Sequence, residues 1–123
     1  MLIYIVDDND LIRSTIRTVI ELQGFSTVDF ASAEDFLRDA RPSGAAALLL
    51  DVNMPGGMSG LELLEEMRAR GTTLPTIIMT VDWTEAVRRA AERAGAPLLR
   101  KPFTPDELKD TIENTLHHPP SGD

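Results

Sequence analysis

Residues 2–9 read Leu-Ile-Tyr-Ile-Val-Asp-Asp-Asn, an apolar run that ends abruptly in two carboxylates and an amide. A short, continuous apolar run is typical of a strand that is buried on both faces of a parallel sheet. Four more strand-like runs follow along the chain, at residues 25–30, 45–50, 74–79 and 96–100. The first stretch therefore predicts the repeating unit of the chain, a buried strand with polar residues where it ends.

The stretches between these runs carry apolar residues at helical spacing. They cover residues 10–23, 32–41, 59–70, 83–94 and 104–116. Residues with the spacing of helix caps stand at the start of several of them: Ser32, Ser59 with Glu62, Asp82 with Glu85, and Thr104 with Glu107. Glycines stand where three of them should end in a left-handed residue: Gly24, Gly71 and Gly95. The start and stop signals therefore agree with the apolar pattern.

Five β–α units in succession predict right-handed crossovers and a parallel sheet with helices on both faces. The expected fold is a three-layer α/β/α sandwich with five strands and five helices. There is no internal repeat and no linker, so residues 1–118 are expected to form one domain. Residues 119–123, which include two prolines and a glycine, are expected to be a disordered tail.

The 123 residues carry a net charge of −8 and contain no cysteine. The lack of cysteine excludes disulfides, thiolate catalysis and Cys-ligated metal centres. The acidic balance argues against nucleic-acid binding through a broad basic face. No apolar run is long enough to span a membrane, and the first residues lack the pattern of a secretory signal. We therefore expect a cytoplasmic protein that contacts neither membranes nor nucleic acid.

Polar side chains that can do chemistry follow four of the five predicted strands. They are Asp7 and Asp8 after the first strand, Asp51 after the third, Thr80 after the fourth and Lys101 at the end of the fifth. Alone, each has a structural explanation as a helix cap, a turn residue, a loop hydroxyl or a surface charge. Because ligands of open parallel sheets bind at the carboxyl ends of the strands, we expect the five to form one site.

Three carboxylates in one place repel each other unless they are protonated or neutralised by a cation. Oxygen ligands without histidine or cysteine favour Mg²⁺, or Mn²⁺, over zinc. Neither His117 nor His118 falls near this edge of the sheet. A magnesium ion beside a carboxylate, a hydroxyl and an ammonium group suits a carboxylate nucleophile that forms an acyl phosphate.

In combination these residues resemble the receiver domain of response regulators over nearly the whole chain. The matching stretches are Asp7–Asp8, residues 50–55 (LDVNMP) around Asp51, Thr80 after residues 77–79 (IIM), and residues 101–103 (KPF). Residues 30–37 (FASAEDFL) are similar to receivers of the FixJ type. The resemblance implies a flavodoxin-like (CheY-like) fold with strand order 2-1-3-4-5.

The resemblance also implies a role for each site residue. Asp51 would be the phosphoacceptor, and its donor would be a phosphohistidine on a histidine kinase or phosphotransfer protein. The side chains of Asp8 and Asp51 and the backbone carbonyl of Asn53 would ligate the metal, with Asp7 acting through a bound water. Thr80 and Lys101 would hold the phosphoryl group. The family pattern further predicts a cis peptide bond between Lys101 and Pro102.

Three features depart from the usual receiver pattern and concern the output rather than the chemistry. Val81 replaces the usual small residue after the threonine, Leu98 stands where many receivers carry an aromatic switch residue, and the loop 54–60 has one extra glycine. We expect output through the face formed by the fourth helix, fifth strand and fifth helix. Leu98 has no polar tip and less area than an aromatic ring, so it gains less by moving inward, and plain core packing is an equal alternative. The expected route is therefore the loop of Val81, Asp82 and Trp83, which joins Thr80 to the fourth helix. Truncating Leu98 should then change the affinity of the activated form for a partner only a few-fold. The sequence is also compatible with a homodimer.

Two other functions remain as alternatives. The chain is expected not to be an enzyme beyond its own phosphorylation and dephosphorylation. A degenerate receiver would bind partners without being phosphorylated, and the complete set of five residues argues against it. A small phosphatase with Asp7 or Asp51 as nucleophile would need a cap over its substrate, and the short connections do not supply one.

Overall fold

The computed structural model describes residues 1–41 and 44–117. Within these ranges the strands are β1 (Leu2–Val6), β2 (Ser26–Phe30), β3 (Ala47–Asp51), β4 (Thr76–Thr80) and β5 (Leu98–Arg100). The helices are α1 (Asp10–Leu22), α2 (Ala33–Asp39), α3 (Gly60–Ala69), α4 (Glu85–Ala94) and α5 (Pro105–His117). The expected disordered tail, 119–123, lies outside the described residues. No helix in the described part of the chain is both long and apolar enough to cross a membrane.

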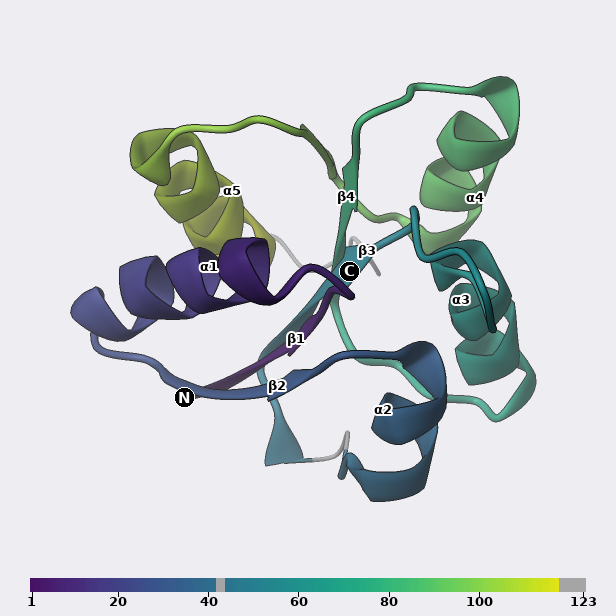
Figure 1. The fold of residues 1–123 in the computed structure, drawn as a ribbon, viewed down its shortest axis with the longest axis horizontal. Helices are drawn as coiled ribbons and strands as arrows, with labels where there is room; N and C mark the ends of the chain where they lie inside the picture. The colour runs from purple at the N-terminus through teal and green to yellow at the C-terminus, as the bar shows by residue number, and fades with distance from the viewer. Residues whose placement is uncertain (42–43, 118–123) are drawn as a thin grey trace.

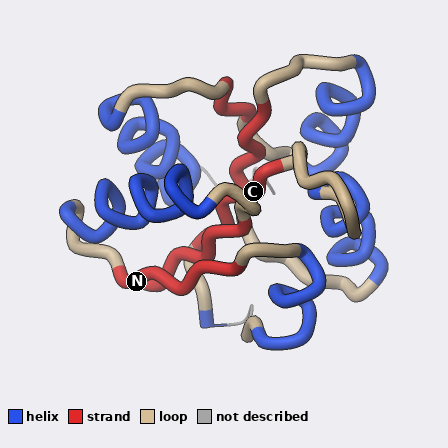
Figure 2. The backbone as a smooth tube through the Cα atoms, viewed as in Figure 1, coloured by secondary structure: helices blue, strands red, loops and turns tan. Residues whose placement is uncertain are grey.

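The strands form one parallel sheet in the order β2-β1-β3-β4-β5, as the resemblance to receivers implied. Figure 2 shows the strands at the centre of the molecule with the helices around them. The middle strands are the buried ones: every residue of β3 and β4 is buried, whereas β2 at one edge is mostly exposed or half-buried. This difference explains why the second apolar run is the least continuous of the five.

Successive side chains of each central strand point to opposite faces of the sheet, so each strand contributes to two cores. Ile3 and Ile5 pack with Ile16 and Ile20 under α1 and α5, whereas Tyr4 belongs to the larger core under the other three helices. Figure 1 shows α1 and α5 on one side of the sheet and α2, α3 and α4 on the other. Two buried faces account for the continuous apolar runs in the sequence.

Most of the predicted helix boundaries are confirmed. Ser32 caps α2, Ser59 and Glu62 form a complete capping box, and Thr104 and Glu107 exchange the same pair of hydrogen bonds. Gly24, Gly71 and Gly95 all have positive φ. The predicted cap at Asp82 is wrong.

The hydroxyl of Thr84 accepts the Val87 N–H, so α4 begins at Glu85 and Trp83 lies in the preceding loop. Asp82 and Thr84 are both residue types that cap helices, and Thr84, which directly precedes the first helical residue, takes the capping position.

Two strands extend one residue further than the apolar pattern indicated. β3 ends at Asp51 and β4 ends at Thr80, and both side chains are buried. Gly60, the first residue of α3, lies directly against this end of β3. A Cβ atom there would overlap the Asp51 carbonyl oxygen and lie 2.6 Å from the Val52 Cα, so only glycine fits.

Candidate functional site

The three predicted acidic residues lie together at the carboxyl ends of β1 and β3. One carboxylate oxygen from each of Asp7, Asp8 and Asp51 lies within 4.8 Å of the other two. Asp7 is 0% exposed and Asp51 is 2% exposed, whereas Asp8 is exposed. The site therefore consists of two carboxylates in the protein interior and a third at its rim.

The ammonium group of Lys101 provides the positive charge for the two buried carboxylates. Its Nζ lies 2.9 Å from Asp7 Oδ2 and 3.2 Å from Asp51 Oδ2, and only 11% of the side chain is exposed. The Lys101–Pro102 peptide bond is cis, as predicted. One lysine balances one of two buried negative charges, so the site keeps an excess of negative charge.

Each of the two buried carboxylates is held by a local turn of the same type. Asn9 N–H donates to Asp7 Oδ1, and Asn53 N–H donates to Asp51 Oδ1, each over 2.9 Å. An aspartate that accepts the amide two residues later forms an Asx turn, which fixes its side chain against the backbone. The two turns leave the other oxygen of each carboxylate beside Lys101.

Burial raises the pKa of Asp51 to about 6, and the negative charge of Asp7 adds to the rise. The Asn53 amide and the Lys101 ammonium group act in the opposite direction but do not offset the burial. A nearby positive charge stabilises the ionised form of such a buried carboxylate. The electrostatics of the site therefore favour the binding of a cation.

The donor atoms of the site suit a hard divalent cation. The group of three carboxylates offers oxygen ligands only, without sulfur or imidazole, and this is the set that Mg²⁺ and Mn²⁺ prefer. The acidic group could therefore hold a metal ion of this kind.

Thr80 is buried at the end of β4, the strand next to β3, and its hydroxyl contacts its own loop closely and the Asn53 side-chain oxygen at 3.4 Å. The hydroxyl donates to the Asp82 carbonyl over 2.7 Å and accepts the Asp82 N–H over 3.1 Å. A hydroxyl has one proton to donate, so Thr80 cannot donate to a ligand without releasing the Asp82 carbonyl.

Three contacts at or near the site were not anticipated from the sequence. The side-chain oxygen of Asn53, a residue expected to act through its backbone, accepts the Val81 N–H over 3.3 Å. Arg13 on α1 donates to the backbone carbonyl of Asp7 over 2.7 Å. Glu34 on α2 accepts the Met58 N–H over 2.8 Å, and this bond lowers the pKa of Glu34. Each contact links separate elements, so no local sequence signal marks it.

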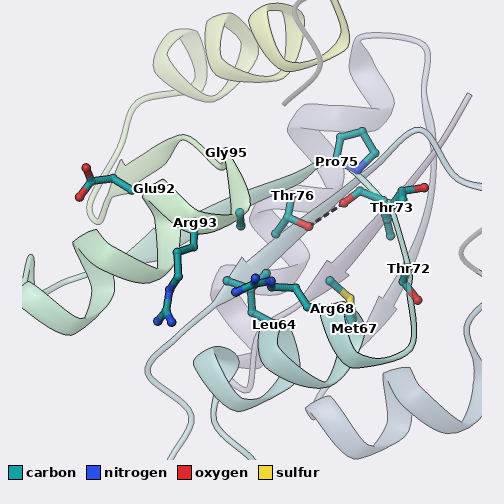
Figure 3. A pocket seen from close by; sticks show the side chains of 12 residues that line it. Leu64, Met67, Arg68, Thr72, Thr73, Pro75, Thr76, Glu92, Arg93 and Gly95 are labelled. Carbon is teal, nitrogen blue, oxygen red and sulfur yellow. Dashed lines mark hydrogen bonds between the residues drawn. The ribbon is translucent and has the colours of Figure 1, made fainter. Parts of the chain in front are cut away.

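A groove of about 600 Å³ lies elsewhere, where β4 begins between the ends of α3 and α4. Figure 3 shows Leu64 and Met67 on one wall and Arg93 on the other. The hydroxyl of the buried Thr76 in this groove donates to the Leu74 carbonyl over 3.0 Å. The groove lies at the amino ends of the strands, whereas the acidic group lies at their carboxyl ends, so the groove is not part of the site.

Comparison with known proteins agrees with this geometry. The family model of the response regulator receiver domain matches residues 3–113. The transcriptional regulatory protein FixJ of Azorhizobium caulinodans is 35% identical over 102 residues, which are 82% of this chain and 48% of that protein. This chain thus spans about half the length of that relative.

Solved structures show the same fold. The response regulator StyR is 37% identical, with a TM-score of 0.84 over 94% of this chain and 59% of that one. A CheY-like receiver domain protein from Methanospirillum hungatei is 26% identical, with a TM-score of 0.85 over 94% of this chain and 93% of that one. The flavodoxin-like fold and the similarity to FixJ that the sequence indicated are therefore confirmed.

Proposed function

Because this chain belongs to the response regulator receiver domain family of two-component systems, we propose that Asp51 is its phosphoacceptor and that phosphorylation controls its contacts with other proteins. The observation that carries the proposal is the buried Asp51 carboxylate, which lies beside a lysine and two further acids at the carboxyl edge of the sheet. A nucleophile, a counter-charge and a candidate cation site are present in one place.

The reaction is a transfer of a phosphoryl group onto a carboxylate oxygen. The phosphorus–nitrogen bond of a phosphohistidine breaks while a phosphorus–oxygen bond to Asp51 forms. The imidazole nitrogen of the donor keeps the bonding electron pair and takes up a proton. The donor is a histidine kinase or a phosphotransfer protein.

Mg²⁺ would be held by the carboxylates of Asp8 and Asp51 and the backbone carbonyl of Asn53, with Asp7 acting through water. When bound, the ion would supply positive charge against the phosphoryl oxygens. Lys101, which already contacts Asp51 Oδ2, is placed to pair with a phosphoryl oxygen in the same region.

Thr80 links the phosphoryl group to the output. Its hydroxyl proton, donated to Asp82 in the unphosphorylated state, would be donated to the phosphoryl group instead. The loop between β4 and α4 then loses one of its hydrogen bonds and changes position. The altered loop adjoins α4, so we assign the α4–β5–α5 face to a downstream protein partner.

Intact-mass analysis after incubation with acetyl phosphate and Mg²⁺ tests the proposal. The wild-type chain should gain the mass of one phosphoryl group, and Asp51→Asn should gain none. Asp39→Asn removes an exposed acid on α2 and should label like the wild type. Equal labelling of Asp51→Asn would refute the assignment of Asp51.

The same preparation separates the two alternatives. A degenerate receiver would gain no mass under any of these conditions. A phosphatase would turn over a generic phosphate ester many times per protein molecule, whereas a receiver consumes one phosphodonor for each labelled chain. Steady turnover of the ester would therefore support a phosphatase and contradict the proposal.

A further inference from the structure

Arg13 on α1 is a partly buried cation that joins the backbone of the acidic site to α1 and β2. Its three guanidinium nitrogens donate to three different acceptors: Asp29 Oδ2 on β2 over 2.9 Å, Asp10 Oδ1 over 2.6 Å and the backbone carbonyl of Asp7 over 2.7 Å. Only 15% of the side chain is exposed. An arginine in this state is held firmly by its neighbours, because the planar fork satisfies several acceptors at once.

The carbonyl that Arg13 contacts belongs to the peptide group that joins Asp7 to Asp8. A peptide group is planar, so holding its oxygen fixes the direction in which the chain leaves toward the Cα of Asp8. The preceding peptide group is held as well, because the Asp7 N–H donates to the Phe30 carbonyl of β2 over 3.2 Å. The backbone is thus tied to β2 directly through Asp7 and indirectly through Arg13 and Asp29.

Asp8 is the member of the acidic group that most needs such support. Asp7 and Asp51 are buried and each accepts a backbone N–H, whereas the side chain of Asp8 is exposed at the rim. An exposed carboxylate that moves freely loses rotational freedom when it binds a metal, and this loss weakens binding. Fixing its backbone reduces that cost.

We propose that Arg13 is a positioning residue for the metal site, which holds the Asp7–Asp8 peptide so that Asp8 faces the cation. This inference rests on the proposed function, because it assumes that the acidic group binds Mg²⁺. Groups that orient metal ligands typically contribute 10- to 100-fold to metal affinity. Removing the Arg13 contacts should therefore weaken Mg²⁺ binding by about 10-fold.

The sign of the effect separates positioning from simple electrostatics. Arg13 is itself a cation close to the acidic group, so its charge opposes the binding of another cation. If charge were its only influence, Arg13→Met would bind Mg²⁺ as tightly as the wild type or more tightly. Weaker binding in this variant can arise only from a loss of ligand geometry that outweighs the relief of repulsion.

Arg17 provides the matched control. It lies one turn further along α1, carries the same charge and contacts the same Asp29, at 3.6 Å, but it is 46% exposed. Arg17→Met therefore removes a positive charge and an Asp29 contact while the Arg13 contact to the Asp7 carbonyl stays. Its Mg²⁺ affinity should equal or exceed that of the wild type.

Titration calorimetry of the 123-residue chain with Mg²⁺ alone, without phosphodonor, measures the affinities. We expect Kd to rise about 10-fold in Arg13→Met and not to rise in Arg17→Met. Arg13→Lys keeps the charge but replaces the fork with a single ammonium group, so its Kd should rise as well. This variant also carries the test if Arg13→Met does not fold.

Equal Kd values for the wild type, Arg13→Met and Arg13→Lys would overturn the inference and leave the phosphoacceptor assignment intact. A wild-type chain that binds no Mg²⁺ would overturn both the inference and the metal part of the proposed function. Loss of labelling in Arg13→Met with unchanged Mg²⁺ affinity would also count against the inference, because the defect would then lie outside the metal site.

Discussion

The guanidinium carbon of Arg100 lies 4.8 Å from the centre of the Trp83 ring. Trp83 belongs to the loop after β4 and is 46% exposed, and Arg100 is the last residue of β5. Such cation–π contacts contribute about 0.5–1 kcal/mol at exposed sites. The contact is therefore strong enough to hold the loop near β5 and weak enough to be broken by a change at Thr80.

Trp83 emission should report phosphorylation. When the Thr80 hydroxyl donates to a phosphoryl group, the loop loses the bond to Asp82, and the Trp83 ring changes its contact with Arg100. Addition of beryllofluoride with Mg²⁺, as an acyl-phosphate mimic, should therefore change the fluorescence of this single tryptophan. Thr80→Ala should reduce the change, and Leu98→Ala should preserve it. A silent Trp83 in a chain that is labelled by acetyl phosphate would exclude this output route.

Lys101→Met should destabilise the metal-free protein by about 3 kcal/mol, because two buried carboxylates lose their counter-charge. The same variant should gain more stability from Mg²⁺ than the wild type does, since the metal no longer competes with an ammonium group. Urea denaturation with EDTA or with Mg²⁺ measures both effects. Lys109→Met, an exposed change on α5, should stay within about 0.5 kcal/mol of the wild type.

Asp51 should make the metal-free protein lose stability as the pH rises. Its pKa is raised by burial from 3.8 to about 6, so the folded chain binds the extra proton between these values and the unfolded chain does not. This contribution to stability is present below about pH 4 and is lost as the pH rises through about 6. Relative to Asp51→Asn, the free energy of unfolding should fall by about 1–3 kcal/mol across this window. A constant difference between the two proteins would contradict the raised pKa.

Mg²⁺ should raise the thermal midpoint of the wild type, because the ion relieves repulsion that exists only in the folded state. The rise should be much smaller for Asp8→Ala. Without metal, Asp8→Ala should be at least as stable as the wild type, since it removes one of three clustered acids. Differential scanning calorimetry with and without Mg²⁺ measures this, and an equal response in both proteins would argue against Asp8 as a ligand.

Gly60→Ala should cost more than about 2 kcal/mol, because the added methyl group meets backbone atoms of β3 that cannot move aside. Gly44→Ala is the control: a Cβ there meets nothing within 4 Å, so its effect should be within about 0.5 kcal/mol. Chemical denaturation compares the two. Equal stability of the two variants would mean that α3 can shift away from Asp51.

The sheet and its helices were predictable because their signals are local. Continuous apolar runs mark the buried strands, and residues such as Ser59 and Gly95 mark helix ends within a few positions. The acidic group was predictable as well, because parallel strands bring their carboxyl ends to one edge. Asp51 and Thr80 were placed just beyond their strands, since a polar residue ends an apolar run even where the backbone pairing continues.

The contacts between elements could not be predicted in this way. Arg13 and the Asp7 carbonyl are six residues apart, and the side chain that joins them must cross from the helix to the preceding loop. Arg100 and Trp83 meet only because β4 and β5 are neighbours in the sheet. The cap of α4 was misplaced because Asp82 and Thr84 are both good capping residues, and only packing decides between them.

The close approach of Gly60 to the Asp51 carbonyl also has a consequence for how this chain can vary. The segment 52–59 leaves β3 after Asp51 and returns to it at Gly60, so the two ends of the segment lie in contact. An insertion within the segment can bulge outward without changing where either end lies. The rim of the site can therefore change in length and shape while the contact between Gly60 and β3 keeps Asp51 in place.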